Sequence, residues 1–145
     1  MRKDAFYSLP LLIACDHAGF ELKNKLLENN RFLWNDLGCF KAERTDYPDF
    51  ANKLCLKLEK NMKGVLICGT GQGMSITANR WKHIRSSLCW NEEIAFLARS
   101  HNNSNVLCLP GQFLDEKKAL SILKVFLKTP FENNEVYQRR IKKLS

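Results

Sequence analysis

Short apolar stretches recur along the chain, separated by longer segments in which apolar residues return every three or four positions. The short stretches cover residues 9–15, 32–36, 64–68, 84–90 and 105–109. Stretches of this length, rich in Leu, Ile and Val, predict β-strands. The one over 32–36 is the weakest, because it is short and contains Asn35.

The segments between these strands have the spacing of amphipathic helices. Helices are expected over 20–27, 50–58, 94–97, 114–127 and about 132–144. A further helix is expected to start near Met74. Consecutive parallel strands need a crossover connection, so this alternation predicts a mostly parallel sheet with helices on both faces. We expect an α/β three-layer sandwich with a five-stranded sheet, formed by residues 1–145 as a single domain. The last helix has few apolar anchors and is expected to pack on a partner subunit.

Six cysteines among 145 residues include no CxxC pair, and most lie inside apolar stretches, where a reduced thiol behaves as a small hydrophobic side chain. This usage indicates a reducing compartment. Arg2 and Lys3 before an apolar stretch that ends at Cys15 have some features of a lipoprotein signal, but Asp4 and Pro10 interrupt it. No run approaches the roughly 18 apolar residues of a membrane span. We therefore expect a cytoplasmic protein without a membrane partner.

The formal net charge of +8 indicates anionic partners, either nucleic acid or phosphorylated small molecules. Most basic residues are spread along the chain, and one dense cluster covers residues 139–143. A solvated helix face and a phosphate-binding role both explain this cluster. The tryptophans, Trp34, Trp81 and Trp90, lie on or beside predicted core elements rather than among the basic residues. This placement argues against a nucleic-acid-binding module.

The third predicted strand ends in Cys68-Gly69-Thr70-Gly71-Gln72-Gly73, where glycines occupy alternate positions. Glycines in such a turn allow backbone N–H groups to point inward, and the helix that follows adds its positive end. The loop is therefore a candidate anion cradle. It lacks the lysine of a P-loop and the GxGxxG spacing of dinucleotide-binding sites. A tight strand-to-helix turn explains the glycines equally well.

Cys68 would give this loop a reactive side chain. The start of a helix favours the thiolate form of a cysteine, which is a usable base or nucleophile near neutral pH. Backbone donors beside it would hold a developing oxyanion, so the layout fits an enolisation site with a cysteine base. The ordinary alternative is a buried thiol at the end of a strand.

Further polar residues flank the other predicted strands. Asp16 and His17 follow the first strand, and His101 and Asn102 end the helix before the fifth. Asp16 has an ordinary alternative role as a helix N-cap, and His101 as a C-terminal cap. Ligands of parallel sheets bind beyond the carboxyl ends of the strands, so we expect these residues to converge with Cys68 on one edge.

Four motifs in unbroken order together resemble ribose-5-phosphate isomerase B, a branch of the ribose/galactose isomerase family. They are Cys15-Asp16-His17-Ala18-Gly19-Phe20-Glu21-Leu22-Lys23, Arg44-Thr45-Asp46-Tyr47-Pro48, Cys68-Gly69-Thr70-Gly71-Gln72-Gly73-Met74-Ser75 and His101-Asn102-Asn103-Ser104-Asn105-Val106. The similarity runs from about Leu11 to the end of the chain. It implies a Rossmann-like fold and a homodimer or dimer of dimers with active sites at the subunit interface. It also implies the interconversion of ribose 5-phosphate and ribulose 5-phosphate through a cis-enediol, without metal or cofactor.

The resemblance also implies roles for individual residues. Cys68 would be the base that moves a proton between C1 and C2, and Asp16 and His101 would open the furanose ring. The backbone around Gly69, Gly71, Gln72 and Gly73 would hold the enediolate oxygens. The remaining implied contacts are those of Thr70, Tyr47 and Asn102 with the sugar and of His17 with the phosphate.

The sequence departs from the family pattern on the phosphate side. Gln112 and Val136 stand where the family usually has arginine, while Arg140 matches a third arginine and Arg139 lies beside it. A single charge-assisted contact to phosphate contributes roughly 1.5–3 kcal/mol. We therefore expect the phosphate to depend on Arg139, Arg140 and His17.

Two other functions remain as alternatives. One is an isomerase of hexose 6-phosphates of the allose or galactose type, and the other is a non-catalytic relative that binds a phosphorylated sugar. Galactose-type enzymes pair two unlike chains, one of which lacks the cysteine. This chain holds Cys68, Thr70 and His101 together, which favours a self-sufficient homomer.

Overall fold

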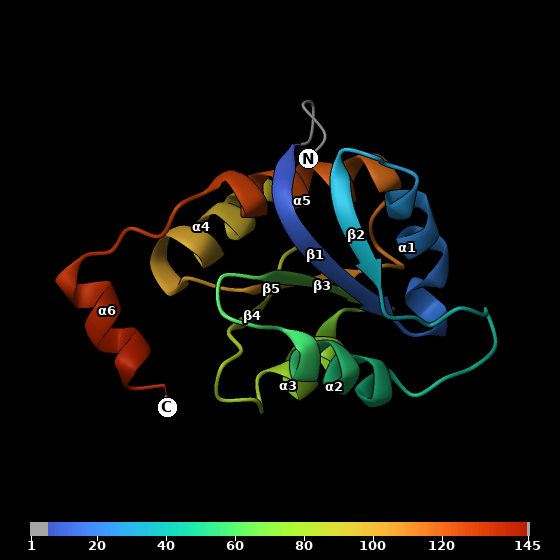
Figure 1. Ribbon diagram of the computed structural model, residues 1–145, viewed down its shortest axis with the longest axis horizontal. Coiled ribbons are helices and arrows are strands. Elements are labelled where there is room, and N and C mark those ends of the chain that lie inside the picture. Colours follow the sequence, from blue (N-terminus) through green and yellow to red (C-terminus); the bar gives the residue numbers. More distant parts are fainter. Residues whose placement is uncertain (1–5, 145) are drawn as a thin grey trace.

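The computed structural model describes residues 6–144, in which strands and helices alternate along the chain (Figure 1). In chain order the elements are β1 (Tyr7–Cys15), the 3-10 helix η1 (His17–Gly19), α1 (Phe20–Leu27), β2 (Phe32–Asp36), α2 (Tyr47–Lys57), β3 (Lys63–Cys68), α3 (Gln72–Ala78), β4 (Ser86–Leu88), α4 (Glu92–Asn102), β5 (Val106–Pro110), α5 (Glu116–Lys128) and α6 (Glu135–Lys142). The predicted alternation is confirmed.

The five strands form one sheet in the order β2-β1-β3-β5-β4, and every neighbouring pair is parallel. The prediction for 32–36 matches β2, although this was the weakest stretch. The prediction for 84–90 is too long, because only Ser86–Leu88 pairs, and β4 is an edge strand with β5 as its single neighbour. The chain then leaves the sheet, and the side chain of Asn91 caps the next helix by accepting a hydrogen bond from the N–H of Ile94.

Helices cover both faces of the sheet, as the three-layer prediction required (Figure 1). Alternate residues of a strand point to opposite faces. Leu11 and Ile13 of β1 pack with residues of α1, α4 and α5, whereas Leu12 and Ala14 pack with residues of α2 and α3. Cys68 belongs to the second core, so its side chain faces the α2–α3 layer.

The last helix, α6, lies beside α4 and away from the sheet (Figure 1). None of its residues is buried, and Val136 is 39% exposed. Such a helix gains little from its own chain, which fits the predicted packing on a partner without testing it. Within residues 6–144, no helix combines the length and the apolar character needed to cross a membrane.

All six cysteines are free and buried, and burial raises the thiol pKa of several of them. Burial raises the pKa of Cys55 to about 11 and the pKa values of Cys89 and Cys108 to about 12 each. Unfolded cysteines ionise with a pKa of about 8.5, so between these values the folded chain holds more protons than the unfolded chain. The free energy of unfolding that these thiols contribute is therefore fully present below the pKa of the unfolded chain, and it is lost as the pH rises above that value.

We predict that the free energy of unfolding falls as the pH rises from 9 to 10, by up to about 1.4 kcal/mol for each such thiol. Urea unfolding under reducing conditions at several pH values measures this slope. A Cys55→Ala variant should lose stability less steeply, because one of the thiols is gone. Equal slopes for the two proteins would contradict the prediction.

Candidate active site

The strand order contains a topological switch point between β1 and β3. From β1 the chain continues toward β2, at one edge of the strand order. From β3 it continues toward β4, at the opposite edge. In open parallel sheets, ligands bind in the crevice beyond the carboxyl ends of such strands. The two loops that start there begin at Asp16 and at Gly69, and they carry most of the predicted site residues.

Asp16 lies beside the end of β3. Cys15 pairs with Ile67 in the ladder, and the backbone N–H of Asp16 donates to the carbonyl of Ile67 at 3.2 Å. Asp16 Oδ1 accepts from the N–H groups of Ala18 and Gly19 at 2.9 and 3.1 Å, so Asp16 has the N-capping role named above as its ordinary alternative, at the 3-10 helix η1. A Cβ at Gly19 would lie 2.5 Å from the Ile67 oxygen, so only glycine allows this approach.

The loop after β3 has the backbone of a tight turn. Gly71 has φ +76°, and its carbonyl accepts from the N–H of Ser75 at 3.1 Å, so α3 begins at Gln72, slightly before the predicted start. Thr70 Oγ1 accepts from the N–H of Gln72 at 3.3 Å. Within residues 6–144, the N–H groups of Gly69, Gly71 and Gly73 have no hydrogen-bond acceptor. These donors are free to bind an anion.

Two side chains lie directly against this loop. A Cβ at Gly73 would come within 2.6 Å of the ring of Tyr47, so glycine is needed for the ring to rest there. On the other side, the N–H of Gln112 donates to the carbonyl of Gly69 at 3.0 Å, and its amide oxygen would lie 3.0 Å from a Cβ at Gly69. The loop therefore has a neutral amide where the resemblance implies an arginine.

His17 is held by Thr45, which lies in the long loop before α2. The N–H of Thr45 donates to His17 Nδ1 at 3.2 Å, and the N–H of His17 donates to Thr45 Oγ1 at 3.0 Å. Because Nδ1 accepts a hydrogen bond, the neutral ring carries its proton on Nε2. His17 therefore presents an N–H donor, which suits an anionic group of a ligand.

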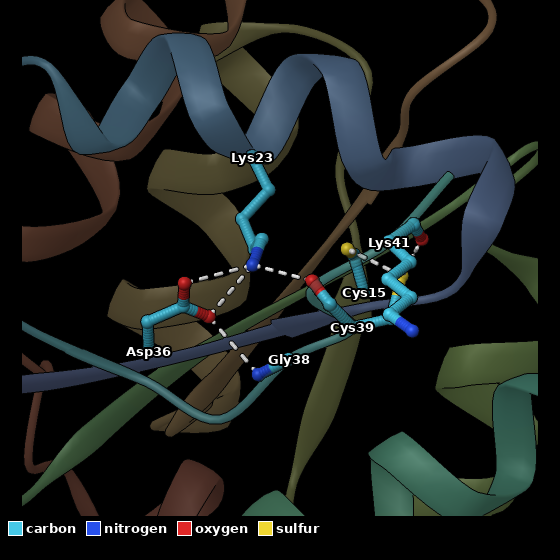
Figure 2. Close-up of polar contacts among 6 residues, drawn as sticks. All are labelled: Cys15, Lys23, Asp36, Gly38, Cys39 and Lys41. Carbon is cyan, nitrogen blue, oxygen red and sulfur yellow. Dashed lines mark hydrogen bonds and ion pairs between the residues drawn. The ribbon is translucent and has the colours of Figure 1, made fainter. Parts of the chain in front are cut away.

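An ion pair between a buried lysine and a partly exposed aspartate anchors the start of that loop (Figure 2). Lys23 Nζ, on a side chain that is 1% exposed, lies 2.8 Å from each oxygen of Asp36 and donates to the carbonyl of Cys39 at 2.7 Å. Asp36 Oδ1 also accepts from the N–H of Gly38 at 3.0 Å, and the sulfurs of Cys15 and Cys39 lie 3.7 Å apart. These contacts join α1, the end of β1 and the end of β2 to the loop that carries Thr45.

The prediction that His101 and Asn102 share this edge is wrong. They end α4, just before β5 begins at Val106, whereas Cys68 pairs with Pro110 at the other end of β5. A five-residue strand spans roughly 13 Å, so one chain places the two groups at opposite edges of the sheet. The reason is topological, since a helix that precedes a parallel strand must deliver its end to the amino edge.

His101 instead belongs to a second group of predicted site residues on α4 and α6. Its ring stacks on Tyr137, with ring centroids 4.5 Å apart and planes at 26°. Asn102, Arg139 and Arg140 are all exposed. Among residues 6–144, no three His, Cys, Asp or Glu side chains gather closely enough to hold a metal ion.

Comparison with known proteins identifies this arrangement. The ribose/galactose isomerase family model matches residues 11–144. The probable ribose-5-phosphate isomerase B of Mycoplasma genitalium is 41% identical over 145 residues, covering 94% of each chain. The crystal structure of a ribose 5-phosphate isomerase from Thermotoga maritima matches with a TM-score of 0.90 and 43% identity, covering 95% of this chain and 98% of that one. The Mycoplasma genitalium enzyme with bound ribulose-5-phosphate matches with a TM-score of 0.87 and 40% identity, covering 95% of each chain.

The chain is therefore a sugar-phosphate isomerase with a Rossmann-like α/β fold. It belongs to the ribose/galactose isomerase family, as the resemblance of its four motifs indicated.

We predict that Lys23→Met lowers the free energy of unfolding by about 3 kcal/mol, because the Asp36 carboxylate loses its buried cation. Lys25→Met is the matched control on the same helix, since Lys25 pairs with Glu21 at the surface. That variant should lose at most about 0.5 kcal/mol. Urea unfolding measures both, and equal losses would contradict the assigned role of Lys23.

Proposed function

We propose that the protein interconverts ribose 5-phosphate and ribulose 5-phosphate through a cis-enediol, with Cys68 as the base. One observation carries the proposal. Cys68 ends β3 at the switch point, and the loop that follows it offers the N–H groups of Gly69, Gly71 and Gly73 without acceptors in the described chain. The names of the related proteins support the same substrates.

The proposed proton transfer uses few groups. From the open-chain aldose, the Cys68 thiolate removes the proton on C2, and the electron pair moves to form an enediolate. The thiol then returns the proton to C1, while the proton of the C2 hydroxyl passes to the oxygen on C1. The loop N–H groups bind the charged oxygen as it develops. Thr70 and Gln72 line this loop, and Tyr47 rests on it, so we assign them to contacts with the sugar.

Ribose 5-phosphate is mainly a furanose, so its ring must open before this transfer. We assign that step to Asp16 and His101. Asp16 Oδ1 is occupied by two backbone donors, which leaves Oδ2 for the sugar. Asn102, next to His101 and exposed, is assigned to a sugar hydroxyl.

The separation of the two residue groups supports a homodimer. Asp16, His17 and Cys68 lie at the carboxyl edge, whereas His101 and the α6 arginines lie elsewhere on the same chain. A two-fold axis brings the second group of one subunit to the first group of the other. We propose such a homodimer, alone or as a dimer of dimers, with α6 packed on the partner. Each site would then combine residues of both subunits.

The phosphate is assigned to His17, Arg139 and Arg140. The Nε2–H of His17 is one donor, and the exposed guanidinium groups of α6 supply positive charge. Gln112, which lies against Gly69, is neutral where the family usually has a positively charged arginine. This observation favours the second candidate, an isomerase of hexose 6-phosphates. A longer sugar would place its phosphate further from the loop. The free cysteines support our prediction of a cytoplasmic enzyme.

We predict that Cys68→Ala lowers the rate of ribose 5-phosphate conversion by about 10²–10⁴-fold, because the variant lacks the base. The assay is run in buffer containing a metal chelator. Cys55→Ala is the control, because it also removes a buried thiol but lies on α2. A Cys68→Ala variant that keeps the wild-type rate would refute the cysteine base, and a wild type active only on hexose 6-phosphates would establish the second candidate.

We predict that Arg140→Ala raises KM for ribose 5-phosphate at least about tenfold, because one charge-assisted contact to the phosphate is lost. Lys143→Ala is the control, since it removes an exposed cation at the end of the same helix. An unchanged KM in Arg140→Ala, or an equal rise in both variants, would mean that Arg140 does not bind the phosphate.

A further inference from the structure

Helix α6 has no buried residue, yet several contacts fix where it begins. The segment before it is tied to α4, because the N–H of Glu132 donates to the carbonyl of Ser100 at 2.9 Å. Arg99 Nε donates to the carbonyl of Thr129 at 3.3 Å. The side chain of Asn134 then caps the helix by accepting from the N–H of Tyr137 at 2.9 Å. Two of these contacts are made by Arg99 and Ser100, the residues directly before His101.

The result is a stack between Tyr137 and His101. Their ring centroids are 4.5 Å apart, a distance at which stacked rings attract each other. Within residues 6–144, neither the His101 ring nor the Tyr137 hydroxyl makes a hydrogen bond. The stack is therefore the specific contact that orients the imidazole, and it leaves both ring nitrogens available for proton transfer.

We propose that Tyr137 is a positioning residue that holds the His101 imidazole for opening of the furanose ring. This inference rests on the proposed function and adds a residue to it. The ring of Tyr137, not its hydroxyl, does the positioning, because the hydroxyl has no partner in the described chain. Phenylalanine should therefore replace tyrosine, whereas leucine removes the flat aromatic face.

Two measurements separate the ring chemistry from the proton transfer. Conversion of ribose 5-phosphate requires the ring to open. Ribulose 5-phosphate has its C5 hydroxyl esterified and cannot close a furanose ring, so it is an open chain. Exchange of its C1 proton with deuterated water requires only the base and the enediolate. A residue that acts through His101 affects the first rate and spares the second.

The test compares the wild type with Tyr137→Leu and Tyr137→Phe. In Tyr137→Leu, conversion of ribose 5-phosphate should fall about three- to tenfold, while deuterium exchange into ribulose 5-phosphate changes less than about twofold. In Tyr137→Phe, both rates should stay within about twofold of the wild type. Proton NMR of the His101 ring gives an independent reading, because the ring-current shift from the stack should persist with phenylalanine and vanish with leucine.

Other outcomes overturn the inference. Equal losses of conversion and exchange in Tyr137→Leu mean that the residue supports the whole site, and no loss means that His101 does not need it. A loss of conversion in Tyr137→Phe as large as in Tyr137→Leu assigns the effect to the hydroxyl. A wild type that shows neither conversion nor exchange contradicts the proposed function itself, whereas an active wild type with an unaffected Tyr137→Leu contradicts only the role of Tyr137.

Discussion

The arrangement of the molecule depends on one constraint, the crossover that every parallel strand requires. Because the chain leaves β1 and β3 in opposite directions, their carboxyl ends meet at a switch point, where ligands of such sheets bind. The hydrogen bond from the N–H of Asp16 to Ile67 fixes the two loops side by side. The close approach at Gly19 holds them there, so Asp16 and Cys68 lie at neighbouring strand ends although 52 positions separate them in the sequence.

The same constraint separates the remaining predicted site residues from this edge. A helix that follows a strand starts near the carboxyl edge, so its far end lies at the amino edge. His101 ends α4 and therefore lies at the opposite side of the sheet from Cys68. Folding of one chain thus leaves the predicted site residues in two separate groups, and the proposed homodimer would join them. The exposure of α6 is compatible with that proposal, since a helix buried on its own chain would not be available to a partner.

Much of the fold was predictable from the sequence, because buried parallel strands are apolar on both faces and stand out as continuous runs. The length of the edge strand β4 was overestimated, because apolar residues such as Ile84 and Trp90 do not show where the strand pairing stops. Lys23 carried a signal that was missed, a lysine between Leu22 and Leu26 on the apolar side of α1. The clamp between Thr45 and His17 carried none, because it depends on how a long loop folds back. The placement of His101 was a topological error rather than a missing signal.

The charge of the molecule limits what the missing arginines can mean. A net charge of +8 attracts a phosphorylated sugar from solution, but screening at physiological salt confines that attraction to about 8 Å. Binding at one position therefore requires donors in direct contact. In the proposed function His17 is such a donor, because its contact with Thr45 leaves the proton of the neutral ring on Nε2, and Lys23 and Asp36 anchor the start of the loop that carries Thr45. With Gln112 neutral, the proposed function makes specificity for the phosphate depend on His17, as this network holds it, and on the arginines of α6.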